Sequence, residues 1–569
     1  MSNMNFKSFG LLILSVTILS GCALKKMKKK ADAISYEVVP EYLEVHGDSV
    51  KVTINGVLPR KYFNRRSTME LNPYIAYEGG QTELKSLRLK GEKIVGDGVV
   101  VQRKDGGSFT YTDRVPFNEG MKVSELKLDI KGARKSKTLD FETVKLADGV
   151  ITTSKMVEST EVAMLGKDKY KKVVPIETSG KVLFDMNKAI VKKDVKKGES
   201  ITKIDQFIAE GHSIIGIQIG GFASPDGAVD LNTKLSVNRS STTYDFLRDF
   251  LKDKGIAQVN DSNFYKRSNT AEDWAGLKNI AGTKDFEDKD KIVSIVNTVS
   301  DVNNREAELK KLTSYRKIAK DLLPPLRRAE IKILANEKRK SDAEISDLAK
   351  NNPTQLTEEE LLYAASMTEN WDEKVAIYSA FMKAFPNDWR GYNNVAYVYL
   401  NQGGKNAEAQ EMLDKANKLD KDNAIIYNNL GVTFLNQSDL KNAESYYLLA
   451  QSFGANESLN LGNVKIRQGD YSSAIAYYGS ANKCTFNSGL ANTLAGNYDA
   501  AGGALNCAPQ AANAFYLKAV LGARTGNLDM LTTNLTRAIK EDASMRDAAK
   551  KDLEFAAYRD SDTFKVAIR

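Results

Sequence analysis

A turn and the helix predicted after it carry the residues best suited to binding a small charged ligand. The turn is Ala223-Ser224-Pro225-Asp226-Gly227, and Arg239 follows it in a helix-like run. A planar guanidinium can grip a carboxylate through two parallel hydrogen bonds, and backbone amides at a helix N-terminus favour the same anion. The pattern predicts an anion site. Alternatively, Arg239 pairs with a carboxylate of the chain and Asp226 only shapes the turn.

The rival chemistry is hydrolysis by a pair of carboxylates, Asp226 and Asp230. Glycosidases use two carboxylates about 5–9.5 Å apart, one of which has its pKa raised by an apolar pocket. The sequence offers no apolar setting for this pair, so we expect no enzyme. His46 and His212 are the only two histidines, and neither has a second metal-type ligand at useful spacing. We therefore predict no metal site and no cofactor.

Cys22 closes the first apolar stretch of the chain. Lys7 supplies a positive charge ahead of Leu11–Leu19, and a run of about nine residues suits a signal peptide but is too short to cross a bilayer. Leu19-Ser20-Gly21-Cys22 resembles a bacterial lipobox. The resemblance implies that residues 1–21 are a lipoprotein signal peptide and that Cys22 becomes the lipidated N-terminus. The alternative is an ordinary signal peptide with an incidental cysteine.

Residues 23–30 contain five lysines and no acidic residue. Surface-displayed lipoproteins of the Bacteroidetes type usually carry acidic residues just after the cysteine. The resemblance therefore implies a lipid-anchored outer-membrane protein that faces the periplasm. We interpret residues 22–33 as a lysine-rich linker, whose side chains are attracted to anionic headgroups by about 1 kcal/mol each.

The other two cysteines, Cys484 and Cys507, lie in a region predicted to be helical. In an oxidising periplasm they can form a disulfide. The alternative is two buried thiols.

Composition sets limits on the class of protein. A chain of 569 residues suggests about three to five domains. Its hydrophobic fraction of 42% and charged fraction of 27% are ordinary for globular protein. The net charge of +9 arises from 82 basic and 73 acidic residues, without the concentrated basic face that nucleic-acid binding needs. We expect no nucleic-acid partner.

Residues 34–177 are predicted to form an all-β sandwich. Alternating or β-branched runs at residues 35–39, 50–54 and 126–130 are typical of half-buried strands. Glycine-rich turns separate them, and further strands are expected between residues 140 and 175. This domain carries no residues suited to chemistry, so we interpret it as a binding or spacer module.

Residues 178–336 resemble the OmpA-like domain, which binds peptidoglycan. The motif is Asn232-Thr233-Lys234-Leu235-Ser236-Val237-Asn238-Arg239 after a strand and a glycine-led turn, and residues 326–333 match the arginine-led final strand. The resemblance implies an α/β fold with βαβ order. A stretch at about residues 258–320 is expected to be a helical insertion.

In that family an aspartate stands at the position of Ser224 and holds the ammonium of diaminopimelate, while the motif arginine holds a carboxylate. Here the nearest carboxylate is Asp226, in a turn that resembles a Bacteroidetes variant. The residues that the resemblance implies for peptidoglycan binding are Arg239, Asp226, Ser224, Asn232 and Ser236.

Residues 353–569 are helical and repetitive. Tyr392-Asn393-Asn394 recurs as Tyr427-Asn428-Asn429 after 35 residues, which is similar to the tetratricopeptide repeat with its period of about 34. Stacked repeats leave a concave surface that suits peptides, and asparagine amides offer donors and acceptors to a peptide backbone. We predict that Asn393, Asn394, Asn428 and Asn429 bind a partner. Alternatively, the solenoid only braces the other domains.

Together these features predict a non-enzymatic periplasmic scaffold lipoprotein. It would link the outer membrane to peptidoglycan and recruit envelope proteins of secretion or outer-membrane assembly machinery through its repeats. The alternatives are a purely structural wall tether and a peptidoglycan-active enzyme.

Overall fold

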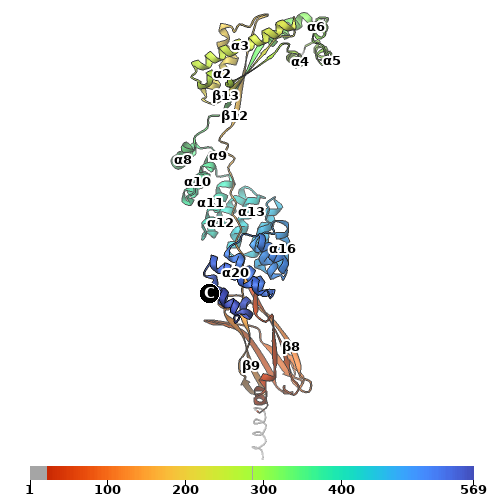
Figure 1. The fold of residues 1–569 in the computed structure, drawn as a ribbon, viewed down its shortest axis with the longest axis vertical. Coiled ribbons are helices and arrows are strands. Elements are labelled where there is room, and N and C mark those ends of the chain that lie inside the picture. Colours follow the sequence, from red (N-terminus) through yellow and green to blue (C-terminus); the bar gives the residue numbers. More distant parts are fainter. Residues whose placement is uncertain (1–21, 285) are drawn as a thin grey trace, which may run out of the picture. The chain divides into compact units, whose positions relative to one another are not determined.

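The computed structural model describes residues 22–284 and 286–569, so the predicted signal peptide at residues 1–21 lies outside the described residues (Figure 1). The chain divides into two compact units. Unit 1 combines the residues up to Lys167 with Thr368–Arg569, and unit 2 is Asp168–Met367. Unit 2 is therefore inserted between two parts of unit 1. None of the helices in the described ranges is long and apolar enough to cross a membrane.

The lysine-rich segment is a docked helix and not the predicted linker. Residues 22–28 are helical, and Leu24 and Met27 are 1% and 2% exposed. Met27 belongs to the core of the β-domain. The spacing of three residues places both apolar side chains on one helix face, which leaves the lysines outside. Cys22 is exposed at the start of this helix.

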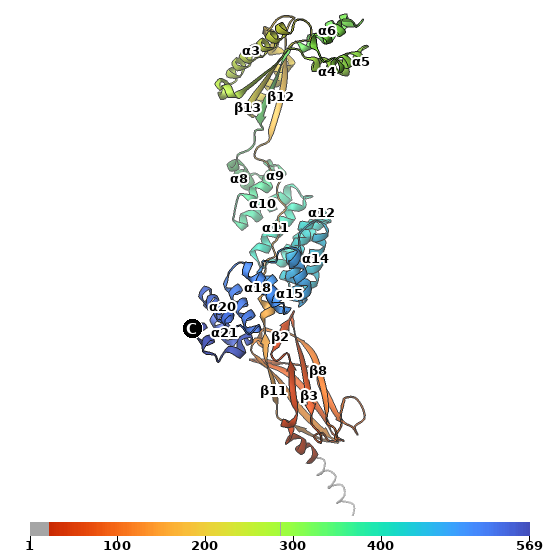
Figure 2. The ribbon, with the colours of Figure 1, turned by 45° about the vertical axis from the view of Figure 1, so that its right-hand side comes forward.

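Residues 35–151 form one curled sheet of eleven strands (Figure 2). In the third strand the buried Val50, Val52 and Ile54 alternate with outward-facing residues, as the pleat requires. Parallel pairing of the second strand with the eleventh joins the two halves. The strands are β1 (Ser35–Val39), β2 (Leu43–His46), β3 (Ser49–Leu58), β4 (Thr68–Tyr77), β5 (Gly80–Glu83), β6 (Leu87–Gly91), β7 (Val99–Val101), β8 (Gly107–Pro116), β9 (Ser124–Arg134), β10 (Lys137–Asp140) and β11 (Val144–Ile151).

Two parts of the β-domain prediction are wrong. The β2–β11 pairing makes one continuous sheet in place of a sandwich of two separate sheets. The strands also end at Ile151 and not near residue 177. Residues 157–167, which we call the strap, form neither helix nor strand. Ala163 of the strap is buried in a core formed by helices of unit 1 and not in a sheet.

Unit 2 contains a four-stranded sheet in the order β12-β15-β13-β14. Its strands are β12 (Pro175–Leu183), β13 (Ser213–Phe222), β14 (Tyr265–Thr270) and β15 (Arg328–Asn336). Helix α3 (Val229–Asp253) connects β13 to its parallel neighbour β14, which gives the predicted βαβ order. Helix α2 (Glu199–Ala209) packs on β12, and α3 packs on β13 and β14.

A glycine fixes how closely α3 approaches the sheet. A Cβ atom on Gly221 would lie 2.0 Å from the carbonyl oxygen of Ser236. Only glycine permits this contact, so the glycine-led turn is required by the packing of the helix that carries Arg239.

The helical insertion of unit 2 starts later than predicted. Residues 265–270 form β14, a polar edge strand in which only Tyr265 is buried, so no alternating pattern marked it. The helices that follow are α4 (Trp274–Thr283), α5 (Lys289–Thr298), α6 (Val302–Lys310) and α7 (Tyr315–Lys317), around a core of their own. Helices α8 (Asp342–Asn351) and α9 (Glu358–Ser366) also belong to unit 2, so residues 353–367 of the predicted repeat region lie in unit 2.

The helical part of unit 1 stacks five antiparallel helix pairs between residues 389 and 541. Buried alanines such as Ala443 and Ala474 lie where paired helices meet. The pairs are α11 (Trp389–Gln402) with α12 (Asn406–Leu419), α13 (Ala424–Asn436) with α14 (Leu440–Ser452), α15 (Ser458–Gln468) with α16 (Tyr471–Ser480), α17 (Phe486–Leu494) with α18 (Tyr498–Cys507), and α19 (Ala512–Arg524) with α20 (Leu528–Glu541). Helix α10 (Trp371–Ala384) precedes them, and α21 (Met545–Lys551) and α22 (Asp562–Ala567) follow.

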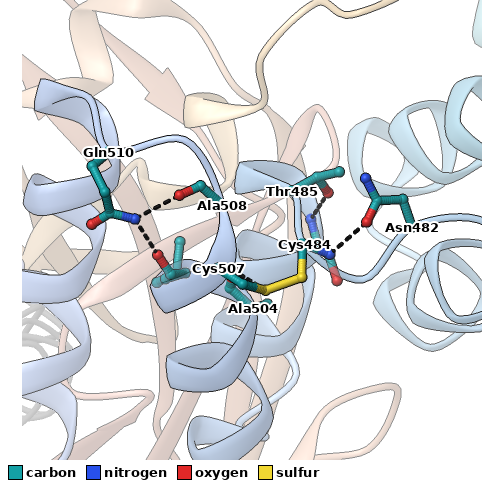
Figure 3. The surroundings of a disulfide bond; sticks show 9 residues. Asn482, Cys484, Thr485, Ala504, Cys507, Ala508 and Gln510 are labelled. Carbon is teal, nitrogen blue, oxygen red and sulfur yellow. Dashed lines mark hydrogen bonds between the residues drawn. A yellow bond between two sulfur atoms is a disulfide. The ribbon is translucent and has the colours of Figure 1, made fainter.

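A disulfide joins Cys484 to Cys507, so of the two alternatives the structure has the disulfide (Figure 3). The bond connects Cys484, two residues before α17 begins, to the last residue of α18. Nearby, the amide of Gln510 donates to the carbonyls of Leu505 and Ala508 at 2.9 and 2.6 Å. The bridge thus links the two helices of one repeat at the ends that lie away from the turn between them.

The β-domain and the helical repeats contact each other within unit 1. The Glu554 carboxylate is held by the guanidinium of Arg524 and the hydroxyl of Thr153. His46 Nδ1 lies 3.0 Å from the hydroxyl of Tyr471. These contacts are buried or partly buried, and they fix the N-terminal end of the strap, which begins right after residues 153–156.

Candidate functional site

A cavity of about 290 Å³ lies in unit 2, beside the turn between β13 and α3. The turn supplies Ser224 and Asp226, the helix supplies Asn232 and Arg239, and the residue before β15 supplies Arg327. The helical insertion lines another part of the cavity. It contributes Glu306 and Lys310 from α6 and Tyr315 from α7.

Arg239 is almost completely buried, with 1% of its surface exposed. Its Nε, Nη1 and Nη2 atoms donate to the backbone carbonyls of Lys188, Phe222 and Asp185 at 3.1, 2.8 and 3.4 Å. Burial, together with the nearby charge of Arg327, lowers the pKa of Arg239 to about 10. Arg239 also lines the cavity, so its positive charge lies at the cavity wall while its hydrogen bonds join residues 185–188 to the end of β13.

Arg327 pairs with the turn carboxylate. Its Nε donates to Ser224 Oγ at 3.1 Å and its Nη2 donates to Asp226 Oδ2 at 3.2 Å. Ser224 in turn donates to Asp226. Both side chains of the ion pair are largely buried, with exposures of 10% and 17%, so an opposite charge is held at the wall of the cavity in fixed geometry.

The helical insertion contributes a second ion pair. Glu306 Oε1 accepts hydrogen bonds from the amide of Gly227 at 2.8 Å and from Lys310 Nζ at 2.7 Å. The hydrogen bond that Lys310 donates to Glu306 raises the pKa of Lys310, and burial raises the pKa of Tyr315. Three cationic and two anionic side chains therefore surround one small volume, a composition that suits a zwitterionic ligand.

Four of the five residues assigned to this site from sequence line the cavity, and Ser236 does not. Ser236 is fully buried and donates to the carbonyl of Thr233 at 2.9 Å. It packs α3 onto β13, so its assignment to ligand binding is corrected. Sequence reasoning missed Arg327, Glu306, Lys310 and Tyr315. Only Arg327 carried a signal, because it stands in the arginine pair before the final strand.

The structure gives Asp226 and Asp230 no setting for acid–base catalysis. Asp226 is paired with Arg327, and Asp230 is exposed in the first turn of α3. Neither has the apolar surroundings that a glycosidase acid needs. Over the described residues, no cluster of three or more histidine, cysteine or acidic side chains is placed to hold a metal ion.

A second site is the groove formed by the first helices of the repeats. Asn393 and Asn394 on α11, Asn428 and Asn429 on α13, Asn463 on α15 and Asn487 on α17 line it, and each is at most 3% exposed. The strap runs through this groove in extended form. The predicted partner-binding asparagines therefore hold a segment of their own chain.

Three of these side-chain amides each form hydrogen bonds with both the backbone N–H and the backbone carbonyl of one strap residue. Asn394 accepts from the amide of Gly166 at 2.8 Å and donates to its carbonyl at 2.9 Å. Asn429 does the same at Met164, at 2.6 and 2.7 Å, and Asn487 does so at Glu158, at 2.9 and 2.8 Å. Successive repeats thus contact even-numbered strap residues, which lie on one side of an extended chain.

The remaining amides complete the ladder. Asn393 and Asn428 donate to the carbonyls of Met164 and Val162 at 3.1 and 3.0 Å. Asn429 also accepts from Asn428 and donates to Asn393, both at 2.9 Å. Because each asparagine also bonds a neighbouring one, the ladder is a connected network of satisfied buried amides.

Asn463 and Asn487 were missed in the sequence, although a signal was present. Asn394, Asn429 and Asn487 each stand two residues before a small residue of the same repeat position, namely Ala396, Gly431 and Gly489. Asn460 occupies the equivalent place before Gly462, yet it bonds Asn428 and Glu457. In that repeat Asn463, one turn later, contacts the strap in its place.

Comparisons with known proteins agree with this architecture. Residues 396–457 match the model of the tetratricopeptide repeat family, so tetratricopeptide repeats are present. No curated protein matches the chain.

Several solved structures of repeat proteins are similar to part of the chain. A Pseudomonas aeruginosa pilF structure is 18% identical and covers 39% of this chain and 97% of its own, with a TM-score of 0.28. PilW, a type IV pilus biogenesis factor, is 16% identical over 40% and 99%, with a TM-score of 0.29. YrrB, a TPR protein with an unusual peptide-binding site, is 17% identical over 37% and 100%, with a TM-score of 0.24. At these identities and TM-scores we draw no functional argument from them.

Proposed function

We propose that this chain is a non-enzymatic scaffold lipoprotein of the outer membrane that faces the periplasm. Unit 2 would bind peptidoglycan, and the tetratricopeptide repeats of unit 1 would recruit envelope proteins. The repeats support the protein-interaction part. The wall-binding part depends on the charged cavity.

The observation that carries the wall-binding proposal is the pairing of opposite charges around the cavity. Arg239 and Arg327 offer guanidinium groups, and Asp226 offers a carboxylate, within one volume of about 290 Å³. Diaminopimelate in a peptidoglycan stem carries a carboxylate and an ammonium on the same end. The first suits an arginine and the second suits Asp226. The likeness of the turn and the α3 motif to OmpA-like domains supports the same assignment.

The lipid anchor is supported by the surroundings of Cys22. This residue is exposed at the head of a helix that Leu24 and Met27 fix to the β-domain. Acyl chains on Cys22 would therefore hold the β-domain directly at the membrane surface, with the five lysines beside the headgroups. Cys22→Ser should move the protein to the soluble periplasmic fraction. Retention in the outer membrane would assign the attachment to protein contacts.

The partners we propose belong to secretion or outer-membrane assembly machinery. A purely structural wall tether would have no specific partner. Crosslinking pull-down from intact envelopes separates the two, because a scaffold retrieves defined proteins through residues 368–569 and a tether retrieves only wall fragments.

Pull-down with purified sacculi tests the wall-binding assignment. Asp226→Asn removes the carboxylate that would meet the ammonium, while the remaining amide oxygen can still accept a hydrogen bond from Arg327 or from Ser224. Asp230→Asn is the matched control, because it removes the same charge from an exposed position four residues on. We expect wall binding to fall about tenfold for Asp226→Asn and to stay unchanged for Asp230→Asn. Equal binding by both variants would contradict the assignment.

A further inference from the structure

The groove of the repeats selects side chains of the strap as well as its backbone. The Glu161 side chain is 3% exposed, 3.0 Å from Asn463 Nδ2 and 3.7 Å from an Arg467 guanidinium nitrogen. Ala163 is 7% exposed and belongs to the core of α11 and α13. These two positions accept an acidic side chain and a small apolar one.

A third position accepts only glycine. A Cβ atom on Gly166 would lie 2.8 Å from Cγ of Arg390 and 3.0 Å from the ring of Trp389. Val162, which stands between Glu161 and Ala163, points outward, with 63% of its surface exposed. The groove therefore reads an acidic residue, an alanine two residues later and a glycine five residues later, and it ignores the side chain at Val162.

We propose that the strap is an intramolecular ligand of a recruitment groove, and that a partner enters by displacing it. The partner would contribute an extended segment with the same pattern: an acidic residue, then alanine at the second following position and glycine at the fifth. This inference deepens the recruitment role proposed above and rests on it.

The contacts of the strap favour exchange over a permanent structural role. Its main-chain bonds are made by neutral side-chain amides, which any extended peptide backbone satisfies equally. The N-terminal end is fixed next to Ser154, whose hydroxyl donates to the carbonyl of Val45. The C-terminal end continues from Lys167 into unit 2, so the strap can peel from Gly166 while the chain stays attached.

Covalent attachment makes the strap a strong competitor. A segment tethered beside its site acts at an effective concentration on the order of millimolar. A free peptide of equal intrinsic affinity must overcome this advantage, so the groove of the wild-type chain should bind external peptides weakly. Weakening the strap should unmask the groove.

The test measures binding of a fluorescent peptide with the sequence of residues 157–167 to the full chain. In the chain variant Glu161→Lys/Gly166→Val the strap no longer fits. We expect the peptide to bind this variant at least about tenfold more tightly than the wild-type chain. Val162→Ser is the control, and it should bind as the wild type does. A peptide that carries Gly166→Val should not bind the Glu161→Lys/Gly166→Val chain. The unchanged peptide should not bind a chain in which Asn394→Ala is added to these two substitutions.

Failure of a folded Glu161→Lys/Gly166→Val chain to bind the peptide would overturn the proposal, as would equal binding of a scrambled peptide. If this variant does not fold, hydrogen exchange of the wild-type chain decides. Saturating peptide should accelerate exchange of the strap amides of Glu158, Met164 and Gly166, and unchanged exchange would overturn the proposal.

Two further outcomes separate this proposal from the wider function. A concentration-dependent dimer of the wild-type chain formed by strap exchange would make the occupant a second copy and overturn the partner assignment. Sacculus binding by the Glu161→Lys/Gly166→Val chain should equal that of the wild type, because the cavity lies in unit 2. Loss of wall binding in Asp226→Asn with peptide binding intact supports the groove as an independent site.

Discussion

The groove of unit 1 and the cavity of unit 2 solve the problem of buried polar groups in opposite ways. The groove is lined by neutral amides that are all bonded to one another or to the strap. The cavity is lined by charged groups that are only partly neutralised by internal pairs. The hydrogen-bonding groups of amides that bind a peptide backbone can be satisfied by the chain itself, whereas an excess of charge favours the binding of a charged ligand. Groove residues should therefore govern folding stability, and cavity residues should govern ligand affinity.

The largest expected effect is confined to unit 1. Replacing both Cys484 and Cys507 by serine removes a bridge across 23 residues and should lower the free energy of unfolding of unit 1 by about 3 kcal/mol. Unit 2 contains no cysteine and should unfold as before. Urea unfolding followed by hydrogen exchange can resolve the two units. An equal loss in both would show that they do not unfold separately.

The next effect concerns the amide ladder. Asn429→Ala removes both bonds to Met164 and leaves buried strap groups without a partner, so the free energy of unfolding of unit 1 should fall by about 2 kcal/mol. Asn436→Ala is the matched control on the same helix. Its side chain is exposed, and its loss should cost less than about 0.5 kcal/mol. Similar midpoints in urea for the two variants would remove the claimed role of the ladder in stability.

The cavity should behave in the reverse way. Lys310 lines the cavity and pairs with Glu306, while its neighbour Lys311 pairs with Glu308 outside it. Lys310→Met should weaken sacculus binding about fivefold and leave thermal stability nearly unchanged. Lys311→Met should change neither quantity. A stability loss without a binding loss in Lys310→Met would reverse the comparison.

The smallest effect depends on pH. Glu457 is fully buried next to the ladder, and burial raises its pKa above the ordinary value. The folded chain therefore holds this proton more tightly than the unfolded chain, so the glutamate costs stability as pH rises above about 4.5. Glu457→Gln should be more stable than the wild type in urea at pH 7 and equal to it near pH 4.

Glu444 provides a control of opposite sign for that titration. Burial raises its pKa, but hydrogen bonds from Lys465 and Gln468 outweigh this and leave the pKa lowered. Its ionised form therefore stabilises the fold above the pKa of the unfolded state, and this contribution is lost as pH falls. Glu444→Gln should be less stable at pH 7. If Glu457→Gln and Glu444→Gln change the free energy of unfolding at pH 7 in the same direction, the opposite pKa shifts assigned to the two glutamates are contradicted.

Much of the architecture could be predicted from local pattern. The β-domain and the helical repeats each have a strong periodic signal, whereas the βαβ order of unit 2 was implied by a family resemblance. Part of the repeat region, residues 396–457, also matches the tetratricopeptide repeat family. The edge strand at residues 265–270 could not be predicted, because only one of its six residues is buried and no alternation of polar and apolar residues results.

The long-range features were out of reach for a different reason. The strap reads as a weak strand, because Val162, Ala163, Met164 and Leu165 are apolar, and nothing local shows that its partner lies more than 200 residues away. The insertion residues Glu306 and Lys310 sit in an ordinary charged helix face. The asparagine repeat was informative, since it identified a peptide groove, but the spacing could not reveal that the peptide is internal.

Hydrogen exchange of the full chain, with and without a soluble muropeptide containing diaminopimelate, tests the central claim most directly. The account predicts that the strap amides of Glu158, Met164 and Gly166 exchange slowly in both samples, because the groove is already filled. The muropeptide should slow exchange at residues 223–239 and 302–327, and a stem peptide with lysine in place of diaminopimelate should do so more weakly. Rapid exchange of the strap, or no change at the cavity with saturating muropeptide, would contradict it.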